Sequence, residues 1–140
     1  MKIRLLNYLS CPLCKGDFLL KNELFENNEI KEGLLICSNC KKEYKISNFI
    51  PRFINADKYA DSFSFEWKKH AKTQLDSVNG TKQSEEAFKE KTGLTPLELK
   101  DKLVLDAGCG MGRFSEIVLK YGGEIVGVDI SYSIESAFQP

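Results

Sequence analysis

The chain has 140 residues, the length of one ordinary domain or of two small ones. Apolar residues at 42% and charged residues at 29% describe a globular protein, and no apolar run approaches the roughly 18 residues of a membrane span. Because 20 Lys and Arg balance 20 Asp and Glu, no overall field draws the protein to nucleic acid or to an anionic membrane.

The chain begins with MKIRLLNYLSC, whose apolar part is too short, and broken too early by Asn7, for a secretory signal. The pattern instead favours a small amphipathic helix with Leu5, Leu6 and Leu9 turned toward a core. We therefore expect a cytoplasmic protein.

Four of the five cysteines form two Cys-x-x-Cys pairs, CPLC and CSNC, separated by 22 residues. Two such turns point four sulfurs at one centre, which is the tetrahedral ligand set that zinc prefers. The predicted metal ligands are Cys11, Cys14, Cys37 and Cys40. Four cysteine ligands leave no position for water or substrate, so this zinc would be structural. Iron or a redox role, and disulfides, are the alternatives, but the sequence gives no sign of an oxidising compartment.

Residues 1–55 form the first predicted domain, a small β-rich zinc ribbon. Short strands are expected at DFLL, ELF, GLLICS, EYKI and FIPRFI, the last two flanking a turn at Ser47-Asn48. A domain of this size buries little apolar surface, and a bound metal offsets that shortfall. Nine Lys and Arg against six Asp and Glu give the ribbon a charge of +3, of which four thiolates around a divalent zinc remove two. Charge therefore does not indicate a nucleic-acid partner.

Residues 56–100 are predicted to be a helical connector. SEEAFKEKTG predicts a helix with Ser84 as its N-cap. TPLE predicts a second helix, with Thr95 as the N-cap and Glu98 completing a capping box. The single histidine, His70, is interpreted as a solvated helix residue rather than a catalytic base. Three aromatic residues are interpreted as packing, with stacking on a ligand as the alternative: Phe63, Phe65 and Trp67.

Residues 101–140 contain a strand–helix–strand pattern. An apolar run from Leu103 to Asp106 precedes the helical segment GRFSEIVLKYGG, and EIVGVDIS follows as a second buried strand. The helix is expected to bury one face, made of Phe114, Ile117, Val118 and Tyr121. The predicted fold class is α/β, a zinc ribbon followed by the first βαβ unit of a Rossmann-like fold.

The loop between this first strand and the helix is rich in glycine. Gly108 and Gly110 match the first two glycines of the dinucleotide fingerprint G-x-G-x-x-G, but the third position holds Arg113 and the third glycine is Gly112. The loop is therefore not that of a nicotinamide-binding protein. A glycine turn that binds nothing is the alternative.

Two acids accompany this loop. Asp106 precedes it, where a carboxylate suits a ligand with an ammonium group and would repel a pyrophosphate. Asp129 ends the second strand, 21 residues after Gly108, where an acid can accept both hydroxyls of a ribose. An adenosine joined to an amino acid meets both demands, which makes S-adenosylmethionine (SAM) the predicted ligand.

VLDAGCGMGRF followed by GVDIS resembles the first motif and the second-strand acid of class I SAM-dependent methyltransferases, over residues 102–137. The resemblance implies four cofactor-binding residues: Asp106, Gly108 and Gly110 at the methionine end of SAM, and Asp129 at the ribose. It also implies that Cys109 is a small filler rather than a nucleophile. No residue here is predicted to be catalytic, because methyl transfer from SAM is driven mainly by positioning.

Residues 1–55, with CPLC, CSNC and IPRF, are similar to the small zinc-ribbon activator proteins of methyltransferases, a module that some bacterial methyltransferases carry at the N-terminus. FSFEWKKHAKTQLDS resembles the connector of such two-part enzymes. Together the resemblances imply a SAM-dependent methyltransferase that acts on an unidentified acceptor.

The methyltransferase fold resembled here has seven strands, of which this sequence supplies two. We therefore expect a truncated product, a gene fragment or half of something larger, in which a second polypeptide could complete the sheet. We expect no methyl transfer by these residues alone. The alternative function is a non-catalytic zinc-ribbon module that binds a partner protein or a methyltransferase. RNA modification is a third option, which the nearly neutral ribbon disfavours.

Overall fold

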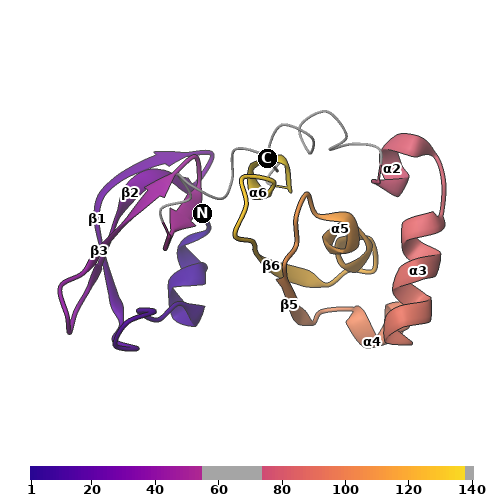
Figure 1. Ribbon diagram of the computed structural model, residues 1–140, viewed down its shortest axis with the longest axis horizontal. Coiled ribbons are helices and arrows are strands. Elements are labelled where there is room, and N and C mark those ends of the chain that lie inside the picture. Colours follow the sequence, from indigo (N-terminus) through magenta and orange to yellow (C-terminus); the bar gives the residue numbers. More distant parts are fainter. Residues whose placement is uncertain (55–73, 138–140) are drawn as a thin grey trace. The chain divides into compact units, whose positions relative to one another are not determined.

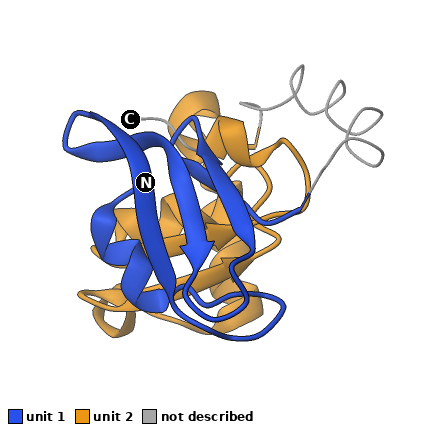
Figure 2. Ribbon diagram, turned by 90° about the vertical axis from the view of Figure 1, so that its left-hand side faces the viewer, with its two compact units in different colours: residues 1–55 blue, residues 56–140 orange. Residues whose placement is uncertain are grey.

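The computed structural model describes residues 1–54 and 74–137. The chain divides into two compact units, Met1–Asn55 and Ala56–Pro140, which Figure 2 colours separately. The described helices that lie within residues 56–100 belong to unit 2. Four connector residues lie outside the described residues: Phe63, Phe65, Trp67 and His70.

Unit 1 consists of a short 3₁₀-helix and a four-stranded antiparallel sheet with the strand order β1-β2-β3-β4 (Figure 1). Its elements are η1 (Ile3–Tyr8), β1 (Phe18–Glu26), β2 (Glu29–Cys37), β3 (Glu43–Ser47) and β4 (Ile50–Arg52). Every strand pairs with the next one along the chain, so the sheet is a simple meander. The predicted β-rich ribbon is thus an antiparallel sheet.

The first strand differs from the sequence prediction. The last three residues of DFLL and all of ELF are parts of the single strand β1, whose pairing with β2 shifts between Lys21 and Leu24. Asn22 lies at this irregularity with a φ of 54°. Because asparagine tolerates the left-handed conformation better than most residues, the strand continues through a segment that resembles a break in the sequence.

Two tight turns connect the hairpins of unit 1. Asn27 and Asn28 join β1 to β2, with φ values of 51° and 62°. Asn48 and Phe49 join β3 to β4, with φ values of 49° and 67°. Two central residues with positive φ match the twist of the flanking strands. The predicted turn at Ser47-Asn48 is therefore wrong by one residue, because Ser47 still pairs with Ile50.

The core of unit 1 is formed by one face of the sheet and the apolar side of η1. Leu5, Leu6 and Leu9 pack against this core, as predicted. The buried residues of the cluster are Met1, Cys11, Ile30, Leu35, Cys37, Tyr44 and Ile46. Two of the predicted metal ligands are thus part of the core itself.

Unit 2 contains a two-stranded parallel sheet, with helices before, between and after its two strands along the sequence. Its described elements are α2 (Asp76–Asn79), α3 (Gln83–Thr92), α4 (Pro96–Leu99), β5 (Leu103–Ala107), α5 (Arg113–Lys120), β6 (Glu124–Val128) and α6 (Ile134–Ala137). Strands β5 and β6 pair in parallel, with Leu103 opposite Glu124, and α5 connects them (Figure 1). The predicted strand–helix–strand unit is therefore present.

Helix α5 buries the predicted face against the sheet and α3. Ile117 and Val118 are 0% and 1% exposed. They form a cluster with Phe88 and Leu99, against which Val104, Phe114, Tyr121 and Ile125 pack. On the opposite face of this sheet, Leu103 and Leu105 are 45% and 65% exposed, so the described elements of unit 2 leave that face largely uncovered. Among these residues, no helix combines the length and the apolar composition that crossing a bilayer requires.

Helix α3 is capped by a residue outside it. The prediction that Ser84 is the N-cap is wrong, because the helix begins at Gln83. The carboxylate of Asp76 instead accepts hydrogen bonds from the backbone N–H groups of Ser84 (3.0 Å) and Glu85 (2.9 Å). This satisfies two of the N–H groups that a helix leaves free at its start. At α4 the predicted capping box, with Thr95 as its N-cap, is confirmed.

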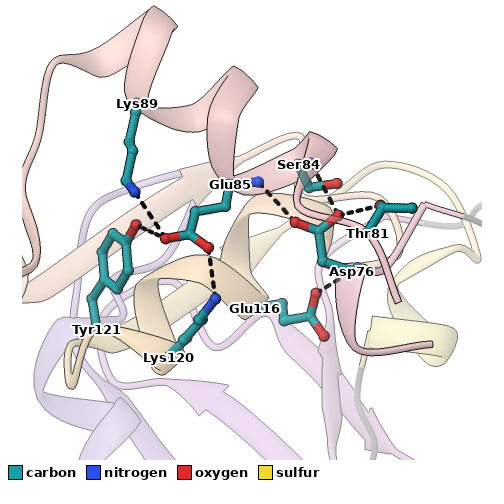
Figure 3. A network of polar contacts seen from close by, with 8 residues as sticks. All are labelled: Asp76, Thr81, Ser84, Glu85, Lys89, Glu116, Lys120 and Tyr121. Carbon is teal, nitrogen blue, oxygen red and sulfur yellow. Dashed lines mark hydrogen bonds and ion pairs between the residues drawn. The ribbon is translucent and has the colours of Figure 1, made fainter. Parts of the chain in front are cut away.

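A buried carboxylate fastens α3 to α5 (Figure 3). The side chain of Glu85 is 11% exposed and accepts hydrogen bonds from Lys120 (2.6 Å) and Lys89 (2.9 Å). The hydroxyl of Tyr121 also donates to it. Lys120 foremost, then Tyr121 and Lys89, lower the pKa of Glu85 to about 2.

We expect Glu85→Gln to lower the free energy of unfolding of unit 2 by about 2 kcal/mol at neutral pH, the scale of hydrogen bonds to a charged group. The folded pKa lies below the ordinary value of 4.5, so the wild-type stabilisation is complete above pH 4.5 and disappears as the pH falls toward 2. Urea unfolding followed by circular dichroism at several pH values measures both effects. Glu86→Gln, at the exposed neighbouring position, is the control and should behave as wild type. Identical curves for wild type and Glu85→Gln would contradict the expectation.

Candidate metal centre and cofactor loop

The four predicted cysteine ligands converge on one point. Their Sγ atoms all lie within 4.8 Å of one another. Separations of 3.4 Å between Cys14 and Cys37 and 3.7 Å between Cys11 and Cys40 are among them. A tetrahedral zinc with Zn–S bonds of about 2.3 Å requires sulfur–sulfur distances of about 3.8 Å, whereas a disulfide requires about 2.05 Å. The four cysteines are therefore positioned to bind a metal ion.

The two Cys-x-x-Cys turns share a positive φ at the same position and the same pair of backbone hydrogen bonds. Lys15 and Lys41, which follow the second cysteine of each turn, have φ values of 62° and 61°. Their N–H groups donate to the carbonyl oxygens of Cys11 (2.8 Å) and Cys37 (3.1 Å). Each first cysteine then donates its own N–H to the carbonyl of the fifth residue after it, at 2.9 Å in both turns. Each of the two turns thus contributes two of the four sulfurs of the site.

The thiols of the cluster have unequal affinities for their protons. Burial acts to raise the pKa of Cys11, but backbone N–H groups of its turn and the Tyr44 hydroxyl, 3.7 Å from the sulfur, lower this pKa to about 6. For Cys40, the N–H of Lys42 acts to lower the pKa, but the Cys14 thiol, burial and the remaining thiols raise it to about 12. A divalent cation would offset the repulsion between four thiolates held this close together.

Gly16 leaves room for the cluster. A Cβ at this position would lie 2.8 Å from the Cβ of Asn39 and 3.1 Å from the Sγ of Cys37. We expect Gly16→Ala to weaken metal binding by about 1–3 kcal/mol, the usual cost of overpacking. Gly33→Ala is the matched control within the ribbon, because its Cβ would approach no atom more closely than 3.5 Å. Competition with a chromogenic chelator measures the affinity, and equal affinities for the two variants would contradict the steric role of Gly16.

The predicted cofactor loop lies at the carboxyl ends of β5 and β6. The N–H groups of Gly108 and Cys109 donate to the carbonyl oxygen of Val128, at 2.8 and 3.1 Å, which ties the loop to the end of β6. Gly108 and Gly110 have φ values of 81° and 53°, and a Cβ on either would meet no atom within 4 Å. The loop therefore needs glycine for its conformation and borders open space.

Asp129 holds this loop in place. Its Oδ2 accepts the N–H of Gly110 at 2.8 Å, and its Oδ1 accepts the N–H and hydroxyl of Ser131 at 2.7 and 2.6 Å. Burial acts to raise the pKa of Asp129, but these hydrogen bonds lower it overall. Asp129 is thus an ionised brace of the loop, in addition to the ligand role that the sequence predicts.

Asp106 lies on the other strand and is bound by the helix that follows the loop. Its Oδ2 accepts a hydrogen bond from the hydroxyl of Ser115, at 2.7 Å. Between the two acids, Cys109 is 7% exposed, and burial, followed by the charges of Asp106 and Asp129, raises its pKa to about 11. A thiol with this pKa is a poor nucleophile at neutral pH, in agreement with the predicted filler role. Gly127 makes space for it, since a Cβ there would lie 2.9 Å from the Cys109 sulfur.

Sequence reasoning missed three side chains that contact these sites: Tyr44, Ser115 and Ser131. For Tyr44 a signal exists, because alternation along EYKI places it on the same face as the core residue Ile46. For Ser131 the Asp-x-Ser spacing is typical of a local side-chain turn. The contact of Ser115 with Asp106 spans helix and strand, and no local pattern predicts it.

The comparisons with known proteins concern the ribbon. The model of the Trm112p-like protein family matches residues 2–48, which include η1, the strands β1 to β3 and all four cysteines of the cluster. No curated protein matches the chain significantly. The ribbon is therefore similar to the Trm112p-like family, and unit 2 lies outside the matched residues.

Proposed function

We propose that unit 1 is a non-catalytic zinc ribbon that binds and supports a methyltransferase. The observation that carries this proposal is the match of residues 2–48 to the Trm112p-like family, small zinc-ribbon activators of methyltransferases, in a chain whose four cysteines converge. A site with four thiolate ligands contributes to folding and leaves no position for a substrate. The ribbon would therefore act by presenting a binding surface to the methyltransferase.

The donor set fits zinc. Four sulfurs within 4.8 Å of one another suit Zn²⁺, and the same set also suits iron, so the metal content of the purified chain distinguishes the two. When bound, zinc would be held by Cys11, Cys14, Cys37 and Cys40 and would cross-link the two turns. It supplies no chemistry beyond that cross-link.

Co-expression of the full chain with SAM-dependent methyltransferases from the same genome tests the proposed role of the ribbon. At least one of them should co-purify with the chain and gain activity from it. Cys37→Ser should abolish this binding because it removes the metal, whereas Cys109→Ser, outside the cluster, should retain it. Absence of any binding, or equal binding by Cys37→Ser, would contradict the proposal.

For unit 2 we propose a second function, the binding of SAM at the βαβ unit. What supports it is the position of Asp106 and Asp129, which flank a glycine loop at the carboxyl ends of two parallel strands, where ligands of α/β proteins bind. Two carboxylates favour a ligand with positive charge, which SAM carries on its sulfonium and ammonium groups. SAM would supply an activated methyl group, and the chain would then be part of a methyltransferase with an unidentified acceptor.

Titration of the full chain with SAM and with NAD, followed by NMR of the loop amides, tests this second function. SAM should shift the signals of Gly108 and Gly110, since their N–H groups lie in the proposed site, and NAD should not, because its pyrophosphate would meet Asp106. A response to NAD, or none to SAM, would refute SAM binding and leave the proposal for the ribbon intact.

A further inference from the structure

The two acids of the loop differ in how many of their oxygens are already bonded. Both carboxylate oxygens of Asp129 accept hydrogen bonds, from Gly110 and from Ser131. Asp106 accepts one, at Oδ2 from Ser115, and among the described residues its Oδ1 has no hydrogen-bond donor. Asp106 therefore has the greater capacity to accept a hydrogen bond from a ligand.

The hydroxyl of Ser115 fixes the orientation of Asp106. Ser115 lies in the first turn of α5, and its Oγ reaches the strand residue Asp106 at 2.7 Å. Helix α5 is in turn immobilised by the buried residues Ile117 and Val118 and by the contact of Lys120 with Glu85. A donor on a fixed helix restricts rotation of the carboxylate, and such pre-orientation reduces the entropy that a ligand loses on binding.

We propose that Ser115 is a positioning residue for cofactor recognition, which holds one oxygen of Asp106 so that the other accepts the ammonium group of SAM. This inference rests on the proposed binding of SAM by unit 2. It divides the work between the acids: Asp106 recognises the amino-acid end of the ligand, whereas Asp129 holds the loop and accepts the ribose hydroxyls at the adenosine end. Ser115 should then affect the affinity only for ligands that have an amino-acid group.

Two adenosine thioethers, one with the amino-acid group and one without it, separate contacts at the amino-acid end of the ligand from contacts at the adenosine. S-adenosylhomocysteine and 5′-methylthioadenosine share the adenosine and the neutral sulfur, and only the first has the ammonium and carboxylate groups. Ser115→Ala should weaken binding of S-adenosylhomocysteine by about three- to tenfold and leave binding of 5′-methylthioadenosine unchanged. The loss is smaller than that of a direct hydrogen bond to a charged group, because Ser115 acts on the ligand only through Asp106. Ser115→Thr retains the hydroxyl and should restore the affinity. Asp106→Asn should show the same selectivity as Ser115→Ala with a larger loss.

The affinities are measured by NMR titration of the full chain, with amide exchange of α5 as a check that each variant stays folded. Equal loss for both ligands in Ser115→Ala would show a general structural role and overturn the proposal. So would unchanged binding of S-adenosylhomocysteine. If the wild-type chain binds neither ligand, the proposed binding of SAM is refuted. If the wild-type chain binds S-adenosylhomocysteine and Ser115→Ala binds it equally well, only the role of Ser115 is refuted.

Discussion

Replacing Cys37 with serine is expected to release the metal and to unfold unit 1. Cys37 is fully buried in the core of the ribbon, and its sulfur lies 3.4 Å from that of Cys14 and accepts the N–H of Cys40 at 3.4 Å. Structural zinc contributes about 10–16 kcal/mol to such sites in peptides, which exceeds the net stability of most small domains. Loss of one ligand therefore removes more stability than the ribbon's core can replace.

The amide spectrum of Cys37→Ser, recorded together with its metal content, measures both effects. Signals from β1 to β4 should collapse to the narrow range of unfolded chains, and the bound metal should be lost. Cys109→Ser is the matched control, since its thiol lies in unit 2 and outside the cluster. A Cys37→Ser chain that keeps a dispersed ribbon spectrum would show that the metal does not hold unit 1 together.

Replacing Asp129 with alanine is expected to weaken SAM binding by about 1.5–3 kcal/mol, or roughly ten- to 150-fold, because hydrogen bonds to a charged group are lost. The structure adds a second cause. Without the carboxylate, the N–H of Gly110 loses its acceptor at 2.8 Å, so the loop should also become less ordered.

Asp129→Asn separates these two causes. Its amide oxygen can still accept the N–H of Gly110, but the charge is gone. NMR titration should give it an affinity between those of wild type and Asp129→Ala, with amide exchange at Gly110 close to wild type. If Asp129→Ala binds SAM as tightly as the wild type does, Asp129 has no part in the site.

Features set by neighbouring residues could be predicted from the sequence. The paired cysteine turns, the capping box at Thr95, and the buried face of α5 with Ile117 and Val118 each depend on spacing within a few residues. Features set by distant contacts could not. The carboxylate of Asp76 caps α3 from another helix, and Asn22 carries β1 through an irregularity that only its pairing with β2 stabilises.

The candidate sites follow the same division. Spacing alone indicated the four cysteines and the placement of Asp106 and Asp129 around the loop, because strand ends and turns determine where those side chains begin. Their hydrogen-bond partners depend on how the elements pack. The contacts of Tyr44 with Cys11 and of Ser115 with Asp106 arise only when separate elements are assembled.

Native mass spectrometry of the full chain tests the central claim, a ribbon folded around one metal ion, most directly. The account predicts one zinc per wild-type chain and per Cys109→Ser chain, and none in Cys37→Ser. Removal of the zinc by a chelator should also abolish the ordered amide signals of unit 1 in the NMR spectrum. A metal-free wild-type chain whose ribbon stays folded would contradict it.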